Sequence, residues 1–389
     1  MRTQVGIIGA GPAGLLLSHL LARQGIASVV VENRPREYVE ARIRAGIIEH
    51  GAVELLVEAG LAERLQKEGE RHHGIYLQWP GERHHLDFPQ LCGRSVWVYG
   101  QTELQKDLDR IRDESGQQIF YEASDVTLHD LATDRPFLRF TDAAGVSQVL
   151  ECDAIAGCDG FHGVSRPSMP DSLRTTRERV YPFAWLGILA EVAPSTDELI
   201  YAWHPNGFAL HSMRSRTLSR LYLQVDPSDD VANWSDDRIW DELATRFALD
   251  GWSLQSGPVV EKSITPMRSF VAAPMRYGRL FLAGDAAHIV PPTGAKGLNL
   301  AVSDVRLLSR ALGRLLNERR DDLADSYSDT ALRRVWRSTH FSWWMTSMLH
   351  RSGDAFDAEL QLSQLRYICS STAASASLAE NYSGMPFDD

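Results

Sequence analysis

The feature that most constrains the fold is a glycine-rich turn at residues 9–14, Gly-Ala-Gly-Pro-Ala-Gly. It follows the apolar run VGII, typical of a short buried strand, and opens the segment PAGLLLSHLLARQG, whose apolar spacing predicts a helix that ends at Gly25. The next run, IASVVVE, is apolar on both faces, as in a strand of a parallel sheet. Strand, turn, helix and strand together predict a βαβ unit of the Rossmann type.

Each glycine of this turn has its own role in a dinucleotide site. Gly9 permits the tight turn, Gly11 lets the backbone approach a pyrophosphate, and Gly14 lets the helix pack closely on the strand. The amides at the start of the helix then receive the phosphate charge. Glu32 ends the second strand 18 residues beyond Gly14, where a carboxylate accepts a ribose hydroxyl. We therefore predict dinucleotide binding, with a tight turn that holds no ligand as the alternative.

Charge and composition argue against several other classes of function. The net charge of −11 does not predict the concentrated basic surface that nucleic acid requires. Four cysteines lie far apart without metal-ligand spacing, so we expect reduced thiols, no metal site and a cytoplasmic protein. Residues 5–22 form an uncharged run long enough for a membrane helix, but its glycines and proline favour a strand, turn and helix, and we expect no membrane partner.

A second acid flanked by small residues, Asp285, favours FAD over a nicotinamide cofactor as the resident dinucleotide. A nicotinamide cofactor in the first site would leave this segment, more than 250 residues later, without a role. An extended FAD places its ribityl chain and ring far from the first turn, within reach of such a carboxylate. The helix start at residues 294–299 then offers backbone donors to an anionic reduced flavin. A buried strand end with a capping acid is the alternative.

The pattern of elements changes twice along the chain and predicts three regions. Short β-type runs fill residues 180–265 without long helices between them, as in an antiparallel sheet, and the chain after residue 287 is mostly helical in pattern. The expected fold class is α/β. It comprises a Rossmann-like FAD-binding domain (1–175 plus 268–295), an antiparallel β-sheet substrate domain (176–267) and a helical C-terminal region (296–389).

Taken together, the motifs resemble the single-component FAD aromatic hydroxylases. Three segments carry the fingerprints of that family: GAGPAG with Glu32, CDGFHGVSR at 158–166, and GDAAHIVPPTGAKGLNL at 284–300. Further matching segments are RIRAGIIEHG, VYGQTEL, RVYPFAWLGILAE, RSFV and FSWWMTSMLHR. The resemblance covers nearly all of the chain and is more specific than any single motif.

The resemblance implies a set of residues around the two nucleotide cofactors. Around FAD it implies Gly9, Gly11, Ala13, Gly14, Glu32, Arg42, Arg44, Ala45, Gly46, Ile47, Gln101, Asp159, Arg220, Asp285, Gly297, Leu298 and Asn299. For the phosphates of the nicotinamide coenzyme it implies Arg44, His162 and Arg268. Without the resemblance, Arg42 and Arg44 would be interpreted as a solvated charged turn.

The resemblance also implies the residues around an aromatic acid. Substrate contacts fall on Tyr201, Ser212, Met213, Arg214, Tyr222, Pro292 and Thr293, and catalytic roles on Tyr201, Tyr382, His72 and Pro292. Arg214 would clamp a carboxylate, while Tyr201, Tyr382 and His72 would form a path for the phenol proton. By themselves, the two tyrosines are more typical of core residues, and Arg214 is as typical of a surface salt bridge.

The activity implied is hydroxylation of 4-hydroxybenzoate at carbon 3 to 3,4-dihydroxybenzoate, with NAD(P)H and O2. Another hydroxybenzoate or dihydroxybenzoate is the first alternative, and a non-catalytic regulator that binds FAD or an aromatic acid is the second. Residues Arg34, Arg36 and Tyr38 suit the 2′-phosphate of NADPH, whereas Glu37 would repel it, so NADPH is expected and NADH is the alternative. The resemblance also implies a homodimer.

Overall fold

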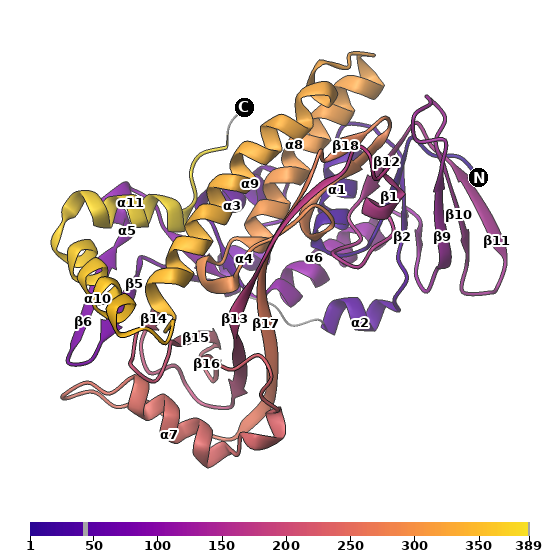
Figure 1. The fold of residues 1–389 in the computed structure, drawn as a ribbon. Helices are drawn as coiled ribbons and strands as arrows, with labels where there is room; N and C mark the ends of the chain where they lie inside the picture. The colour runs from indigo at the N-terminus through magenta and orange to yellow at the C-terminus, as the bar shows by residue number, and fades with distance from the viewer. Residues whose placement is uncertain (42–45, 388–389) are drawn as a thin grey trace.

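Two long strands join the two lobes of the molecule. The structure, a computed structural model, describes residues 1–41 and 46–387. Strands β13 (Thr175–Ala190) and β17 (Val259–Ala273) pair along almost their whole length and run from one lobe to the other (Figure 1). The lobe with the parallel sheet and its glycine-rich turns lies at one end of this two-stranded ribbon (Figure 1). At the other end, β13 and β17 are part of a second sheet.

The first lobe is built on a mostly parallel sheet. The strand order is β18-β19-β12-β1-β2-β8, and the pairs are parallel except at the β18–β19 edge. Its strands are β1 (Val5–Ile8), β2 (Ser28–Val31), β8 (Ile119–Phe120), β12 (Ala154–Gly157), β18 (Arg276–Tyr277) and β19 (Leu280–Leu282). All four residues of β1 are buried, as expected for a strand covered on both faces. Helix α1 (Pro12–Ala22) packs on β1 and β2 and contacts α6 (Gln101–Glu114) and α8 (Gly297–Asn317).

Two small sheets and several short helices extend this lobe. One sheet is the antiparallel set β9 (Ser124–His129), β10 (Phe137–Thr141) and β11 (Ser147–Glu151), and the other comprises β3 (Ile47–Ile48), β4 (Glu70–His72) and β7 (Val96–Val98). The short helices are α2 (Arg36–Ala41), α3 (His50–Glu58) and α4 (Glu63–Glu68).

Within the described residues, the second sheet has eight strands and is mostly antiparallel. Its order is β20-β17-β13-β16-β15-β14-β5-β6, with antiparallel pairing except between β14 and β5. Besides β13 and β17 it contains β5 (Gly74–Trp79), β6 (Glu82–Asp87), β14 (Leu199–Ala202), β15 (Ala209–Ser215), β16 (Leu218–Val225) and β20 (His288–Ile289). Helix α7 (Asp236–Arg246) packs its buried Ile239 and Leu243 into an apolar cluster with this sheet.

The C-terminal helices close a separate apolar cluster against the same sheet. They are α9 (Asp322–Leu349), α10 (Ala355–Ser370) and α11 (Thr372–Ser383), and α11 also contacts the short helix α5 (Phe88–Cys92) (Figure 1). Tyr201 from β14 and Tyr382 from α11 both belong to this cluster. Among the described helices, none combines the length and apolar composition needed to cross a bilayer.

The α/β fold class is confirmed, with two departures from the sequence expectation. First, α7 lies inside the range expected to lack long helices; Ser235 caps it by accepting from the Arg238 amide, a local helix signal. Second, β5 and β6 come from residues 74–87, outside the region 176–267, and add a parallel pair to a sheet expected to be antiparallel. The sequence-based division into three regions is otherwise a prediction.

Candidate active site

The β1–α1 turn is shaped for close approach of a phosphate at Gly11. A Cβ at Gly9 would collide with the Cys158 carbonyl, and one at Gly14 would collide with the Gly9 carbonyl, whereas a Cβ at Gly11 would meet no described atom within 4 Å. Gly9 has φ = +102°, which favours glycine. No side chain of the described residues caps α1, so its first amides remain available to an anion. This geometry fits a pyrophosphate.

Glu32 lies at the end of β2, beside this turn. Its carboxylate accepts hydrogen bonds from the amides of Ala10, at 2.8 Å, and Arg34, at 2.9 Å, which leaves further lone pairs for a ribose hydroxyl. The amide group of Gln105 supports the turn from α6 by donating to the Ala10 carbonyl at 2.9 Å. Sequence reasoning missed Gln105; its signal was a polar residue on the buried face of an amphipathic helix.

Three motifs far apart in sequence converge at this turn. A Cβ on Gly9 would lie 3.0 Å from the Cα of Asp159, and one on Gly284 would lie 3.6 Å from the Cβ of Ala13. Asp159 is held by the Ser165 amide and hydroxyl at 2.8 and 2.9 Å through Oδ2, while its buried Oδ1 has no hydrogen-bond partner within the described residues. Burial raises the pKa of Asp159. An unpartnered buried oxygen here fits a donor from a bound cofactor.

The turn at Asp285 is held by a buried ion pair. Asp304 accepts from the Gly284 amide at 2.8 Å and pairs with His288 at 2.6 Å. Burial alone would lower the pKa of His288, but the Asp304 carboxylate outweighs burial and raises it. Asp285 itself is partly exposed. The pair thus fixes the glycine turn that carries Asp285.

The start of α8 leaves space for a ligand. A Cβ added to Gly297 would meet no described atom within 4 Å, and Leu298 is partly exposed. The side chain of Asn299, in contrast, is engaged within the protein: it accepts from the Glu49 amide at 2.9 Å and donates to the Ile47 carbonyl at 3.0 Å. A contact between Asn299 and FAD would therefore use its backbone.

The remaining residues expected around FAD are more dispersed. Arg42, Arg44 and Ala45 lie outside the described residues. Gln101 begins α6 and is partly exposed. Gly46 and Ile47 line the aromatic pocket. Arg220 lies on β16 rather than at the glycine turns; its guanidinium stacks on Tyr222 at 5.3 Å and pairs with Glu261 at 3.6 Å.

His162 and Arg268, two of the residues expected to hold the nicotinamide coenzyme, lie beside the same ring. His162 is exposed and packs edge-on against Phe161, with ring centroids 4.9 Å apart. Arg268 lies 5.0 Å over the same ring and pairs with Glu178 at 3.3 Å. The third residue, Arg44, lies outside the described residues. The structure thus places one arginine and one exposed histidine next to Phe161.

A single pocket of the second sheet collects most of the residues expected to bind the aromatic acid. Its empty volume is about 410 Å³, including the part open to solvent. The lining residues that the sequence predicted for substrate are Tyr201, Ser212, Met213, Arg214, Tyr222 and Pro292. Sequence reasoning missed the apolar walls Val98, Trp185, Leu199, Leu210 and Ala295, whose residue types do not differ from ordinary core.

The pocket carries positive charge at Arg214. Burial lowers the pKa of this guanidinium, and Tyr222 next to it counters the effect. Burial raises the pKa of the Tyr222 hydroxyl, but Arg214 and Arg220 outweigh burial, so the net shift is downward. Ser212 donates its hydroxyl proton to the Arg220 carbonyl at 2.9 Å, so toward a ligand it can act as an acceptor. The arrangement therefore favours an anionic group beside Arg214.

Two tyrosines form a buried hydroxyl pair at this pocket. The hydroxyls of Tyr201 and Tyr382 are 2.7 Å apart, and each residue is 1% exposed. Burial raises the pKa of both phenols, well above 10 for Tyr201, so both stay protonated at neutral pH. Each can therefore accept one proton while it donates another, as a relay requires.

Two of the expected residues lie away from this pair. Thr293 is fully buried and its hydroxyl accepts from Thr346 at 2.9 Å; it does not line the pocket. His72 is buried on β4, and neither ring nitrogen has a hydrogen-bond partner in the described part of the chain. Burial lowers the pKa of His72 to about 4, so its ring is neutral at pH 7. A proton path from Tyr382 to His72 would need bridging water.

A dinucleotide cradle and a pocket lined by Arg214 and Tyr201 are typical of a flavin-binding enzyme, and comparison with known proteins identifies the family. Residues 2–342 match the family model described as FAD binding domain, and the chain belongs to this family, with FAD as its cofactor. Over its whole length it is 51% identical to the p-hydroxybenzoate hydroxylase of Acinetobacter baylyi (strain ATCC 33305 / BD413 / ADP1), of which it covers 96%.

More distant relatives share the fold. The chain is 25% identical, over 91% of its length, to a 3-(3-hydroxy-phenyl)propionate/3-hydroxycinnamic acid hydroxylase of Comamonas testosteroni, and it spans 58% of that longer protein. The crystal structure of the p-nitrophenol 4-monooxygenase PnpA from Pseudomonas putida DLL-E4 superposes with a TM-score of 0.84 at 19% identity, covering 99% of each chain. The latter similarity concerns the fold alone.

Proposed function

We propose that the chain is an FAD-dependent monooxygenase that converts 4-hydroxybenzoate, NAD(P)H, a proton and O2 into 3,4-dihydroxybenzoate, NAD(P)+ and water. The observation that carries this proposal is one pocket with a carboxylate anchor, Arg214, and a phenol contact, Tyr201, whose hydroxyl pairs with Tyr382. The full-length similarity to a p-hydroxybenzoate hydroxylase supports the same substrate.

Arg214 orients the acid by its carboxylate. A guanidinium can donate two parallel hydrogen bonds to a carboxylate, which fixes direction as well as affinity. Each charge-assisted bond contributes about 1.5–3 kcal/mol. Tyr222 and Ser212, which line the same pocket, would accept or donate beside the carboxylate. This end of the pocket therefore determines which ring carbon faces the cofactor.

The other end of the pocket activates the ring. A phenolate directs an electrophile to its ortho carbon far better than a phenol does. Lowering the pKa of the substrate hydroxyl from about 10 to about 8 requires roughly 2.7 kcal/mol of preferential phenolate stabilisation. Tyr201 can accept the phenol proton as it passes its own hydroxyl proton to Tyr382, which in turn releases a proton outward. The Tyr201 hydroxyl then donates a hydrogen bond to the phenolate. His72 is the proposed end of this path.

FAD supplies hydride uptake from NAD(P)H and activation of O2 when it is bound. The residues that would hold it are at the three converging turns: Gly11 at the pyrophosphate, Glu32 at the ribose, and Asp159 and Asp285 further along. The apolar lining beside Tyr201 keeps bulk water from the reacting oxygen, which would otherwise leave as peroxide. Pro292 is exposed at the pocket and we assign it a backbone contact with the reacting group.

NADPH is the proposed reductant, bound at His162 and Arg268 beside Phe161. Arg34 stacks over Tyr38 at 5.2 Å and remains a candidate for the 2′-phosphate. Arg36, in contrast, is committed to Glu40 at 2.6 Å and Asp113 at 2.7 Å. Steady-state rates with the two coenzymes test this proposal, and a tenfold preference for NADH would contradict it.

The assembly and compartment are also proposals. We infer a homodimer, which the exposed apolar side chains Trp336, Phe356, Leu360 and Tyr367 on α9 and α10 support. Sedimentation velocity of the purified chain tests it, and a monomer at micromolar concentration would refute it. A cytoplasmic location is consistent with the four unpaired cysteines.

The experiment that tests the proposed activity is NAD(P)H oxidation by the FAD-loaded protein with and without 4-hydroxybenzoate, followed by product identification. The expected result is strong stimulation by the acid and accumulation of 3,4-dihydroxybenzoate. The same assay with a panel of other hydroxybenzoates and dihydroxybenzoates distinguishes this activity from the first alternative, in which one of those acids is the substrate. Tight binding of the acid without stimulated oxidation would indicate the non-catalytic regulator instead.

A further inference from the structure

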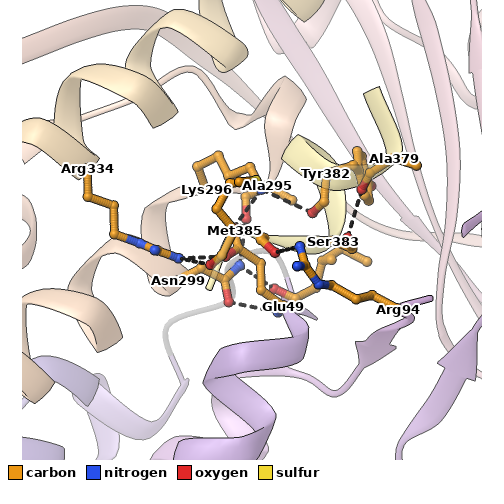
Figure 2. Close-up of polar contacts among 12 residues, drawn as sticks. Glu49, Arg94, Ala295, Lys296, Asn299, Arg334, Ala379, Tyr382, Ser383 and Met385 are labelled. Atoms are coloured by element: carbon orange, nitrogen blue, oxygen red, sulfur yellow. Dashed lines mark hydrogen bonds and ion pairs between the residues drawn. The ribbon is translucent and has the colours of Figure 1, made fainter. Parts of the chain in front are cut away.

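The residues that follow Tyr382 are held by basic side chains from two other parts of the chain. We call residues 384–387 the C-terminal strap. Arg94 donates to the carbonyl of Gly384 at 2.8 Å. Arg334, on α9, donates to the carbonyls of Met385 at 2.9 Å and Pro386 at 3.0 Å. Figure 2 shows these arginines approaching the strap from different elements. The strap thus has a charged donor on each of three successive carbonyls.

A buried carboxylate, Glu49, organises the same cluster (Figure 2). Glu49 pairs with Lys296 at 2.6 Å and with Arg334 at 3.5 Å, and their side chains are only 7%, 3% and 11% exposed. Lys296 also donates to the Tyr382 carbonyl at 3.0 Å. Because buried charges are costly unless they are paired, this arrangement has few alternative geometries.

The strap fits tightly against Glu49. A Cβ on Gly384 would collide with the Glu49 carboxylate, so glycine is required for the strap to lie there. At the other end of the strap, the centroid of the Phe387 ring lies 4.8 Å from the Cζ atom of Arg334. The strap is therefore fixed by polar bonds to its backbone and by contacts with its side chains.

Fixing the strap also fixes Tyr382. This tyrosine lies in the last turn of α11, one residue from the end of the helix and two residues before the strap. Its hydroxyl is 2.7 Å from that of Tyr201, a distance that a small rotation of the helix end would break. No other hydrogen bond of the Tyr382 hydroxyl is present in the described residues. The end of α11 that carries the relay hydroxyl is thus held by Lys296 at the Tyr382 carbonyl and continues directly into the strap.

We propose that Arg94 and Arg334 are positioning residues which, by clamping the strap, hold the Tyr382 hydroxyl against Tyr201 during ionisation of the substrate phenol. The proposal rests on the proposed function, because it concerns the relay of that reaction. Neither arginine touches the substrate: both act through the backbone of the strap.

The variants for the test separate the arginine bonds to the strap carbonyls from the ion pairs of Glu49. Arg94→Ala removes a strap bond without touching the Glu49 pairs, whereas Arg334→Ala removes two strap bonds and one Glu49 contact. Arg94→Lys keeps a donor and should restore the wild-type behaviour. Arg333→Ala, the exposed neighbour on α9, is the matched control. Tyr382→Phe serves as the reference for a lost relay.

Three readouts apply to the FAD-loaded protein. Hydrogen–deuterium exchange over residues 379–387 reports the strap without any turnover. The ultraviolet spectrum of bound 4-hydroxybenzoate against pH reports ionisation of the phenol, and the ratio of product to NAD(P)H consumed reports coupling. We expect exchange to accelerate about tenfold or more in Arg94→Ala, from the loss of one charge-assisted bond. We also expect phenol ionisation to shift to higher pH and coupling to fall, as in Tyr382→Phe.

A double variant distinguishes a positioning role of Arg94 from a general structural one, because the effects of two variants that act through the same hydroxyl do not add. If Arg94 acts through Tyr382, the double variant Arg94→Ala/Tyr382→Phe should ionise the phenol no worse than Tyr382→Phe alone. Exchange in Arg94→Ala equal to that in the control Arg333→Ala would overturn the proposal. Faster exchange in Arg94→Ala with unchanged ionisation of the substrate phenol would also overturn it. So would ionisation defects of the two single variants that add up in the double variant. If Arg334→Ala does not fold, Arg94→Ala and its lysine rescue decide the question. A wild-type chain that never oxygenates 4-hydroxybenzoate would instead refute the proposed function itself.

Discussion

Replacement of Arg214 by lysine tests the anchor of the aromatic acid. Arg214 lines the pocket, and the positive charges of Arg214 and Arg220 outweigh burial and lower the pKa of the neighbouring Tyr222 hydroxyl. The same charges favour a bound anion. A lysine keeps the charge but can replace only one of two parallel hydrogen bonds to a carboxylate. The loss of one charge-assisted bond costs about 1.5–3 kcal/mol, which corresponds to about a 10- to 150-fold increase in Kd.

The assay is a titration of the flavin absorbance with 4-hydroxybenzoate and, in parallel, with 4-hydroxybenzamide. The amide keeps the ring and the phenol but lacks the carboxylate charge. In the wild-type chain the acid should bind much more tightly than the amide, and in Arg214→Lys this advantage should shrink by the same 10- to 150-fold. Arg216→Lys, an exposed position two residues away, is the control and should leave both affinities unchanged.

An acid affinity within threefold of wild type in Arg214→Lys would refute this role of Arg214. The role would equally be refuted if the acid and the amide lost affinity by the same factor. In either case the carboxylate would lie elsewhere, and the orientation of the ring toward the cofactor would need another explanation.

Three further predictions concern the relay, the cradle and the buried ion pair. Tyr201→Phe should bind the acid with similar affinity yet form product about 100-fold more slowly, measured by single-turnover product analysis, since the phenol loses its proton acceptor; an unchanged rate would contradict the relay. Gly11→Ala should weaken FAD binding by about 1–3 kcal/mol with little change in apoprotein stability, whereas Gly14→Ala, which collides with the Gly9 carbonyl, should destabilise the apoprotein itself; flavin titration and thermal unfolding separate the two. The pKa of His288 is raised by Asp304, so the stability contributed by this pair should be fully present below about pH 6.5 and lost as pH rises through the raised pKa. The difference in Tm between wild type and His288→Gln should therefore shrink toward alkaline pH, and a difference that grows with pH would contradict the assignment.

The dinucleotide lobe could be predicted from the sequence because its signals are local. The collision of a Cβ at Gly14 with the Gly9 carbonyl arises within this short segment, and the buried strands on each side have a clear apolar pattern. The turn at Asp285 also follows such a strand. The residues that carry these signals lie within short segments, so they can be recognised from the sequence without the fold.

The aromatic pocket could not be predicted in this way. Tyr201 and Tyr382 are 181 residues apart, and only the resemblance to a known family indicated that they meet. Asn299 and Thr293 matched the family pattern, but the fold commits their side chains to Glu49, Ile47 and Thr346. The strap was missed entirely, because its arginines bind backbone carbonyls, and a carbonyl leaves no mark on the sequence.

The measurement that tests the central claim most directly is oxygenation of 4-hydroxybenzoate by the purified, FAD-loaded chain under ¹⁸O2. We expect NAD(P)H oxidation that depends on the acid, and 3,4-dihydroxybenzoate with one labelled oxygen at carbon 3. Labelled peroxide without labelled product, or coenzyme oxidation indifferent to the acid, would contradict that claim.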